Sequence, residues 1–312
     1  MNTPPPLTAL DDRLHPPATQ DRWWTETYWF SFDQPGEDIS ATIYPLFRPN
    51  LGICSLGVFV WDPTAHEPWR VPYARNYWHL AMPSTEATEL RLEGLSYDCL
   101  EPLQRYHVSY HDDGLIDLDL EYAGMRPPHA PAIAKGVGHL DQPCSVVGEV
   151  VLRGRRVKID TVGMRDRTWS LRAEDRRNAT AYTYGHADSY NQFLVLTTLD
   201  GNNGSIVGGV FSGYLVRDGV HAGLVDATRR VVARSNGYPT RIEIDATDTL
   251  GRRLEAVGTA RNRLANQANA SQFAWMSMMS WNVTGSNSLV GEDQEVWSPD
   301  RLGPVLEGLG TR

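Results

Sequence analysis

The sequence is poor in several features that mark common classes of protein. Its three cysteines, Cys54, Cys99 and Cys144, lie far apart and form no C-x-x-C pair, so neither a disulfide framework nor a cysteine zinc site is expected. No apolar run approaches the roughly 18 residues that a membrane-spanning helix needs, and the first residues lack the basic and apolar pattern of a secretion signal. These absences favour a reduced, cytoplasmic protein that is not inserted in a membrane.

Motifs for nucleotides and nucleic acids are also missing from the sequence. The G-x-G at Gly136 lacks the third glycine of a dinucleotide site and a preceding strand, no P-loop occurs, and neither Ser55 nor Ser212 lies in a G-x-S-x-G elbow. The formal net charge is −9 without a basic block, which argues against a nucleic-acid partner. No metal or redox motif is visible, so we expect neither a metal nor another cofactor, and any chemistry has to come from side chains.

What the sequence does contain is a long series of short strand patterns. Residues 115–122 alternate between apolar and acidic side chains, and Asp112-Asp113-Gly114 before them is a hairpin signal. Comparable segments recur at a spacing of roughly 8–12 residues, with turns of Gly, Asn and Asp between them. The pattern predicts an all-β protein with little helix, built as barrels or sandwiches.

Two stretches of unusual composition indicate where domains begin and end. Residues 1–20 are rich in proline and aspartate and predict a disordered arm. Residues 125–138 contain three prolines and two glycines without a regular period, which is typical of a linker. We therefore expect an N-terminal β-domain over 21–138 and a C-terminal β-domain over 139–312, a division that suits a chain of 312 residues.

A ten-residue stretch near the middle of the chain combines unusual chemistry. Residues 163–172, GMRDRTWSLR, hold one carboxylate, three arginines and a tryptophan. Because arginines flank Asp166, we expect a lowered pKa for its carboxyl group, and a role in orienting Arg167 or Trp169 rather than in donating a proton. A salt-bridged corner closed by Trp169 is the alternative, because structural ion-pair networks have the same composition.

The segment DRTWSLR at 166–172 resembles the D-[RH]-x-W-G-x-R signature of the carotenoid 1,2-hydratase and AttH-like proteins. The chain as a whole resembles an uncharacterised bacterial group related to them, through residues 24–27, 44–50, 77–80, 139–143 and 291–293. The resemblance implies two lipocalin-like β-barrel domains in tandem, the second carrying the signature, and a site near Asp166, Arg167 and Trp169. Arg167 stands where the hydratases have histidine, and Ser170 where the family has glycine.

Other residues are candidates for the site on chemical grounds. A carboxylic acid near an apolar cavity can stay protonated and donate to an alkene, and Asp188, Glu149 and Asp141 are less surrounded by charge than Asp166. For Glu149, the alternative is a side chain facing water. The run that holds Glu292, Asp293 and Glu295 is typical of a solvated loop.

The binding residues are expected around the same motif. The pairs His139 with Asp141 and His186 with Asp188 each point one way if they lie on strands, and could form the polar end of an apolar pocket; a hydrogen bond at a domain junction is the alternative for the first pair. The expected substrate-binding residues are His139, Asp141, Tyr182, Tyr184, His186, Trp275 and Trp281.

Two classes of function fit these features. The first is an enzyme of the hydratase, isomerase or cyclase type, which protonates a double bond of a hydrophobic, isoprenoid-like small molecule without a cofactor; the ten tryptophans and thirteen tyrosines offer aromatic faces that can stabilise a carbocation. The second is a carrier, because lipocalin-like barrels enclose apolar ligands without any chemistry. The residues alone favour neither, and the resemblance favours the enzyme. The oligomeric state is open.

Overall fold

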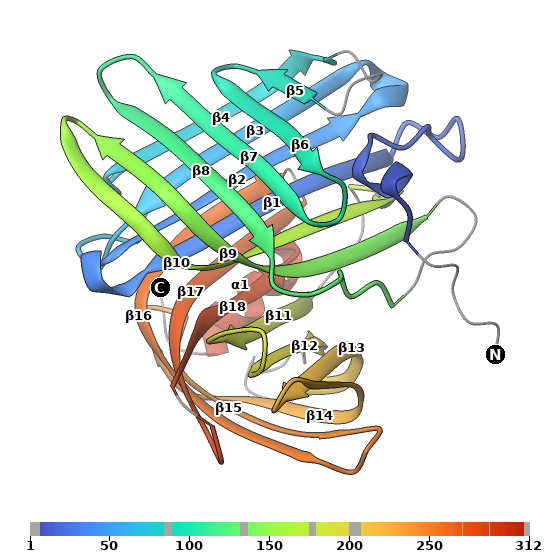
Figure 1. Cartoon of the computed structure of the whole chain (residues 1–312), viewed down its shortest axis with the longest axis vertical. Helices are drawn as coiled ribbons and strands as arrows, with labels where there is room; N and C mark the ends of the chain where they lie inside the picture. Colours follow the sequence, from blue (N-terminus) through green and yellow to red (C-terminus); the bar gives the residue numbers. More distant parts are fainter. Residues whose placement is uncertain are drawn as a thin grey trace. The chain divides into compact units, whose positions relative to one another are not determined.

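The computed structural model is built almost entirely of β-strands (Figure 1), which confirms the expected all-β class. It describes residues 7–83, 89–131, 137–174, 179–199, 207–269, 271–286 and 288–308. The chain divides into two compact units: residues 1–60 with 71–173 form the first unit, and residues 61–70 with 174–312 form the second.

The first unit is a ten-stranded sheet in the order β4-β3-β2-β1-β10-β9-β8-β7-β6-β5. The strands are β1 (Trp24–Gln34), β2 (Ile39–Arg48), β3 (Ile53–Trp61), β4 (Tyr73–Ala81), β5 (Glu89–Leu92), β6 (Leu95–Glu101), β7 (Arg105–Asp112), β8 (Ile116–Gly124), β9 (Gly138–Leu152) and β10 (Arg155–Leu171). Three short 3₁₀ helices accompany them: η1 (Ala9–Asp12), η2 (Pro35–Glu37) and η3 (Pro49–Leu51). The long strands β1, β9 and β10 are central, so their side chains are the best fixed.

The core of the first unit lies on one face of this sheet. Alternation places Tyr28, Phe30 and Phe32 of β1 on that face, where they pack with the inward side chains of 115–122 that the sequence predicts. The other face of β1 carries threonine, serine, Trp29 and Asp33, and these side chains are also buried. Both faces of β1 are therefore covered.

The second unit is a closed barrel of eight strands, β11 to β18 in sequence order. They are β11 (Ala179–His186), β12 (Gln192–Leu199), β13 (Val207–Arg217), β14 (Val220–Ser235), β15 (Tyr238–Asp248), β16 (Arg253–Asn269), β17 (Gln272–Val283) and β18 (Leu289–Trp297), followed by helix α1 (Pro299–Gly308). Residues 61–70 belong to this unit through contacts such as Trp61 Nε1 donating to Asn262 Oδ1 at 2.9 Å.

A buried charge network lies among the barrel strands. Arg229 on β14 makes ion pairs of 2.6 Å with Asp293 and 3.0 Å with Glu295, both on β18, and all three side chains are fully buried. Glu292 is fully buried as well. The expectation of a solvated loop at 292–295 is therefore wrong, because these carboxylates lie on a strand and two of the three pair with a buried arginine.

The division between units differs from the boundary expected at residues 138 and 139. The Pro/Gly-rich stretch connects β8 to β9, which pair with each other over 116–124 and 144–152, so it links two strands of one sheet; its residues 132–136 lie outside the described residues. Strands β9 and β10, with the signature, belong to the first unit. Apart from residues 61–70, the second unit begins after residue 173.

The N-terminal segment also departs from expectation. Residues 1–6 lie outside the described part, but residues 7–20 are held against the first unit. Thr8 and Asp11 form a capping box around η1, and the side chain of Asp12 at its end is 1% exposed. A disordered arm over 1–20 is thus wrong for the described residues, because the buried Asp12 carboxylate, the hydrogen bonds of Arg167 to the segment's backbone and the stacking of His15 on Trp169 anchor it. No helix among the described ranges is long and apolar enough to cross a membrane.

Candidate active site

Strand geometry sorts the signature residues onto two faces of β10. Successive side chains of a strand point to opposite sides, so Arg165, Arg167 and Trp169 share one face while Asp166 and Thr168 share the other. The contacts agree with this division: Arg165 reaches Asp12 and Arg167 reaches Glu26, whereas Asp166 reaches His139. The signature therefore contributes to two separate groups of residues.

The group on the Asp166 side joins β10 to β9. Asp166 lies directly opposite Asp141 in the register of the two strands, and Thr168 lies opposite His139. His139 Nε2 is 3.0 Å from Asp141 Oδ2, and its Nδ1 is 2.7 Å from Thr168 Oγ1 and 3.5 Å from Asp166 Oδ2. One imidazole thus lies between two carboxylates.

The charges in this group shift the pKa values of two members. Burial and the Asp141 carboxylate together raise the pKa of Asp166 to about 6, although the charge of His139 lowers it. Burial alone would lower the pKa of His139, but Asp141 and Asp166 raise it to about 9. At neutral pH the group holds an imidazolium, and Asp166 is poised to exchange a proton.

This result corrects the expectation that the flanking arginines lower the pKa of Asp166. Arg165 and Arg167 are adjacent in sequence, but alternation turns their guanidinium groups to the opposite face, where they pair with Asp12 and Glu26. Burial and the second carboxylate therefore outweigh them. Sequence neighbours on a strand are poor predictors of electrostatic neighbours.

The accessible surface of the group distinguishes it from a purely structural network. The side chains of His139 and Asp166 are 25% and 15% exposed, while Asp141 is fully buried behind them. Trp29 on β1 lies opposite Asp166 in register and is anchored by its Nε1 donating to Thr42 Oγ1 at 2.5 Å. Trp29 is 7% exposed, so it lies largely buried on the same face of the sheet as Asp166.

The same three side chains could, by spacing, surround a metal ion. One ligand atom from each of His139, Asp141 and Asp166 lies within 4.8 Å of the others. In the metal-free chain the pKa of His139 is about 9, so its imidazolium pairs with the two carboxylates. A metal ion at this position would have to displace that proton, because a ligating histidine nitrogen has to be unprotonated.

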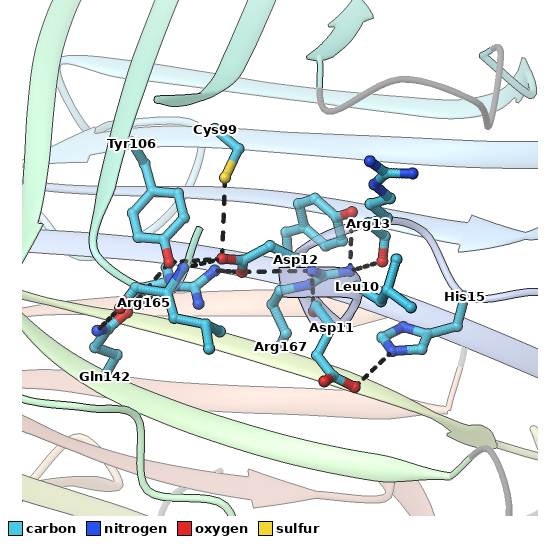
Figure 2. Close-up of polar contacts among 12 residues, drawn as sticks. Leu10, Asp11, Asp12, Arg13, His15, Cys99, Tyr106, Gln142, Arg165 and Arg167 are labelled. Atoms are coloured by element: carbon cyan, nitrogen blue, oxygen red, sulfur yellow. Dashed lines mark hydrogen bonds and ion pairs between the residues drawn. The ribbon is translucent and has the colours of Figure 1, made fainter. Parts of the chain in front are cut away.

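On the opposite face, Arg165 and Arg167 form a buried ion network with the N-terminal segment (Figure 2). Arg165 Nη1 donates to Asp12 Oδ1 at 2.7 Å, and Arg167 Nη1 is 3.7 Å from the same oxygen. Arg167 also pairs with Glu26 and donates to Tyr28 Oη at 2.9 Å. The side chains are at most about 3% exposed, a burial that suits structure rather than turnover.

Trp169 closes this network. Its ring stacks on His15 with centroids 4.0 Å apart and an interplanar angle of 9°, and it packs with Trp24 and Leu140. Gly138 lies beneath it, where a Cβ atom would come within 2.3 Å of Trp169 Cζ2. Trp169 is buried, as the sequence predicts, but in the first unit rather than in a C-terminal domain.

The remaining candidate acids lie in ordinary surface settings. Glu149 on β9 is partly exposed and pairs with Arg156 across the β9–β10 hairpin. Asp188 is exposed in the turn after β11, where its Oδ1 accepts from the backbone N–H of Tyr190 at 2.8 Å and Asn191 at 2.9 Å. The Glu149 carboxylate is therefore neutralised by an arginine at the surface, and the Asp188 carboxylate caps a turn.

The other expected binding residues belong to the second unit. Tyr184 and His186 on β11 stack with centroids 5.0 Å apart, Tyr184 donates to Glu292 Oε2 at 3.2 Å, and Tyr182 meets Tyr184 edge-on. Trp275 packs near α1, whereas Trp281 packs among the apolar side chains of the barrel. These residues form a Tyr–His–Glu group and two separate tryptophan contacts within their unit.

Several residues of the two groups in the first unit carried no assigned role in the sequence. Asp12, Glu26 and Gln142 each bind a buried arginine of the signature. Glu26 and Gln142 lie in the segments 24–27 and 139–143 that carry the family resemblance, which was the available signal. The sequence offered no such signal for Asp12, because this residue stands in a stretch whose composition is typical of disordered segments.

The comparisons with known proteins agree with this architecture. A family model described as a domain of unknown function, DUF7064, matches residues 8–288. No curated protein matches the chain.

Among solved structures, a putative AttH from Nitrosomonas europaea aligns with a TM-score of 0.66 at 13% identity, covering 88% of this chain and 92% of its own. Kievitone hydratase from Nectria haematococca aligns at 0.58 and 10%, covering 88% and 89%. CghA with Sch210972 aligns at 0.55 and 11%, covering 89% and 88%. At these identities the likeness establishes the fold, and it confirms the resemblance to AttH-like proteins. By the match over 8–288, the chain belongs to the DUF7064 family.

Proposed function

We propose that the chain is an enzyme that transfers a proton to and from a carbon–carbon double bond of a hydrophobic, isoprenoid-like small molecule, with Asp166 as the acid and no cofactor. The observation that carries the proposal is the raised pKa of Asp166, about 6, in a partly exposed position beside His139. A general acid works best when its pKa is close to the operating pH. The raised pKa leaves more of the Asp166 carboxyl group protonated near neutral pH than the ordinary value of 3.8 would.

The three members of the triad have different roles in this reaction. Protonated Asp166 gives its proton to one alkene carbon, which leaves a carbocation on the other carbon and a carboxylate on Asp166. The His139 imidazolium, 3.5 Å away, stabilises that carboxylate. Asp141 holds the imidazolium in place from the buried side, at 3.0 Å.

In this proposal the indole ring of Trp29 stabilises the carbocation intermediate. Trp29 lies opposite Asp166 on β1, and side chains directly opposite on neighbouring strands have Cβ atoms about 5 Å apart. An indole face at that position can attract the developing positive charge by a cation–π interaction. Loss of an adjacent proton to Asp166 would complete an isomerisation. Capture of the cation by a second double bond or by water, followed by loss of a proton to Asp166, would complete a cyclisation or a hydration.

The shared fold with a protein named as a hydratase supports this class of chemistry. Arg167, which replaces the histidine of the carotenoid hydratases, points away from Asp166 and is occupied by Glu26 and Tyr28. It is therefore a positioning residue in this proposal, and isomerisation or cyclisation is favoured over hydration.

The test is incubation of candidate polyenes with the full chain in deuterium oxide, with EDTA and without nicotinamide or flavin. The proposal predicts deuterium on a product carbon, at a rate that EDTA does not change. Deuterium without added oxygen would identify isomerisation or cyclisation. Saturable binding of the polyene without any exchange would instead show a carrier, and dependence on a metal or nicotinamide would overturn the cofactor-free assignment.

A further inference from the structure

The carboxylate of Asp12 sits in a site that the body of the first unit supplies (Figure 2). Its Oδ1 accepts from Arg165 Nη1 at 2.7 Å. Its Oδ2 accepts from Tyr106 Oη at 2.9 Å and from the backbone N–H of Leu103. The donors come from β7, β10 and the turn between β6 and β7, whereas the acceptor comes from the N-terminal segment.

The charge balance of this site depends on Asp12. Arg165 and Arg167 are fully buried, and their buried counter-charges are Asp12 and Glu26. Without the Asp12 carboxylate, one buried guanidinium would lose its neutralising charge, which is strongly unfavourable. The site therefore requires an anion whenever Asp12 is elsewhere.

The site offers more hydrogen-bond donors than the Asp12 carboxylate uses. Among the described residues, Arg165 Nη2 and Arg167 Nε are buried and make no hydrogen bond. Aromatic rings frame the guanidinium groups, since Arg165 lies 4.0 Å above the Tyr106 ring and Arg167 lies 4.0 Å above the Tyr28 ring. A planar guanidinium group that rests on an aromatic ring is suited to bind the carboxylate of a ligand whose remaining part is apolar.

The segment that carries Asp12 is held by the ion pair of Asp12 and by hydrogen bonds to its backbone: Arg167 Nη1 donates to the carbonyl of Asp11, and Arg167 Nη2 donates to that of Arg13 at 2.6 Å. Residues 8–10 are exposed and Leu10 is 65% exposed, so Asp12 is the buried residue of η1. Further along, the His15 backbone N–H donates to Glu26 Oε2 at 2.8 Å and its ring stacks on Trp169. Displacement of the segment breaks these contacts, so the free energy for it has to come from the ion pairs that a ligand carboxylate makes with the buried guanidinium groups.

We propose that Arg165, Arg167, Tyr106 and the Leu103 N–H form a binding site for a small organic carboxylate, which Asp12 occupies as an internal substitute and yields when the ligand binds. The site is independent of the proposed proton transfer, because it lies on the opposite face of β10 from Asp166. Its ligand replaces the Asp12 carboxylate oxygen for oxygen and displaces residues 7–15.

The first experiment asks whether the site accepts a free carboxylate. The full chain with Asp12→Ala lacks the side-chain carboxylate, so sodium formate has the size and charge of the missing group. Thermal unfolding is followed with increasing formate, at constant ionic strength maintained with sodium chloride. We expect the variant to melt lower than the wild type in chloride, and formate to raise its Tm in a saturable way, as a ligand that binds only the folded state does.

A matched control is Asp245→Ala, which removes an exposed carboxylate from its pair with Arg253. Formate and chloride should affect this variant and the wild type equally. The absence of a formate-specific rise in Asp12→Ala would overturn the proposal, and so would an equal rise in all three proteins, which would mean an adventitious ion only.

The second experiment asks whether Asp12 yields to a ligand in the unaltered protein, and it also serves if Asp12→Ala does not fold. Benzoate is added to the wild type, with benzenesulfonamide as an uncharged aromatic control, and hydrogen–deuterium exchange of peptides covering residues 8–15 is measured. Benzoate should speed the exchange of these amides at least several-fold while the β9–β10 peptides stay unchanged. Unchanged exchange at saturating benzoate would contradict displacement of the segment.

Discussion

At the scale of single residues, the environment of Asp166 decides its chemistry. It shares its face of β10 with Thr168 and faces His139 and Asp141 on β9. The arginines beside it in sequence are directed to the other side and neutralised there. Burial therefore raises the pKa of Asp166, and the Asp141 carboxylate adds to that rise.

Replacing Asp166 tests its role as the acid. Asp166→Asn keeps the size of the side chain and removes the transferable proton, so we expect turnover to fall by roughly 10²–10⁴-fold, the usual contribution of a general acid. The wild-type rate should rise as the pH falls toward about 6, as more Asp166 becomes protonated. Asp188→Asn and Glu149→Gln are controls of the same chemical type, and a comparable loss in either would move the acid away from Asp166.

Replacing His139 tests the ion-paired triad through stability. In the folded chain the pKa of His139 is about 9, above its ordinary value of 6.5, so the folded form binds the proton more tightly than the unfolded form. The stability that this contributes is fully present below about pH 6.5 and is lost as the pH rises through 9. Wild type and His139→Gln should differ in free energy of unfolding at pH 6 and converge by pH 9.5, as measured in urea. A pH-independent difference would contradict the pairing.

At the scale of elements, the β9–β10 hairpin is the part that positions both groups of residues. The two strands pair from Gly138–Trp169 to Leu152–Arg155, so their register decides that Asp141 meets Asp166 on one side. The same register puts Gly138 under the ring of Trp169 on the other. A shift by one residue would exchange the faces and destroy both groups.

The close approach of Gly138 to Trp169 can be tested by adding one methyl group. Gly138→Ala would place its Cβ 2.3 Å from Trp169 Cζ2, and the ring cannot retreat because it stacks on His15. We expect a loss of about 1–3 kcal/mol in the free energy of unfolding, as for overpacked cores. Gly36→Ala is the control, since its Cβ would meet nothing within 4 Å; equal effects of the two substitutions would refute the packing argument.

The barrel has its own buried element contact, between β14 and β18. Asp293→Ala would leave the fully buried Arg229 with Glu295 as its remaining carboxylate partner among the described residues. Removing one partner of a buried ion pair lowers the free energy of unfolding by about 3 kcal/mol or more. Asp245→Ala, in an exposed pair on β15, should change the unfolding free energy little. A similar small effect for Asp293→Ala would show that the network carries no stability.

At the scale of the whole molecule, alternation and turn signals were enough to predict the class of fold. They predicted strands such as 115–122, and the family resemblance added the tandem lipocalin-like architecture. The boundary between units was not predictable, because the Pro/Gly-rich stretch before β9 looks like a linker although β8 and β9 pair across it. Only long-range pairing shows that β10 adjoins β1 in the first unit.

The candidate site was predictable in part. The sequence singled out Asp166, His139 and Asp141, but it did not join them, because the register of β9 on β10 is a tertiary fact. The buried partners Asp12 and Glu26 were missed for a related reason: they lie more than one hundred residues from the arginines that they neutralise. The sequence shows which charged residues are present, but which of them form ion pairs depends on the tertiary structure.

The central claim is that Asp166 is a carboxyl group poised to exchange a proton near neutral pH. The most direct measurement is the titration of its carboxyl carbon by NMR in the full chain labelled with ¹³C at aspartate, with Asp166→Asn used to assign the signal. The account predicts a midpoint of about 6, with a smaller step as His139 loses its proton near pH 9. A midpoint close to the ordinary value of 3.8 would show that Asp166 is a permanently ionised structural carboxylate, and would contradict the proposed chemistry.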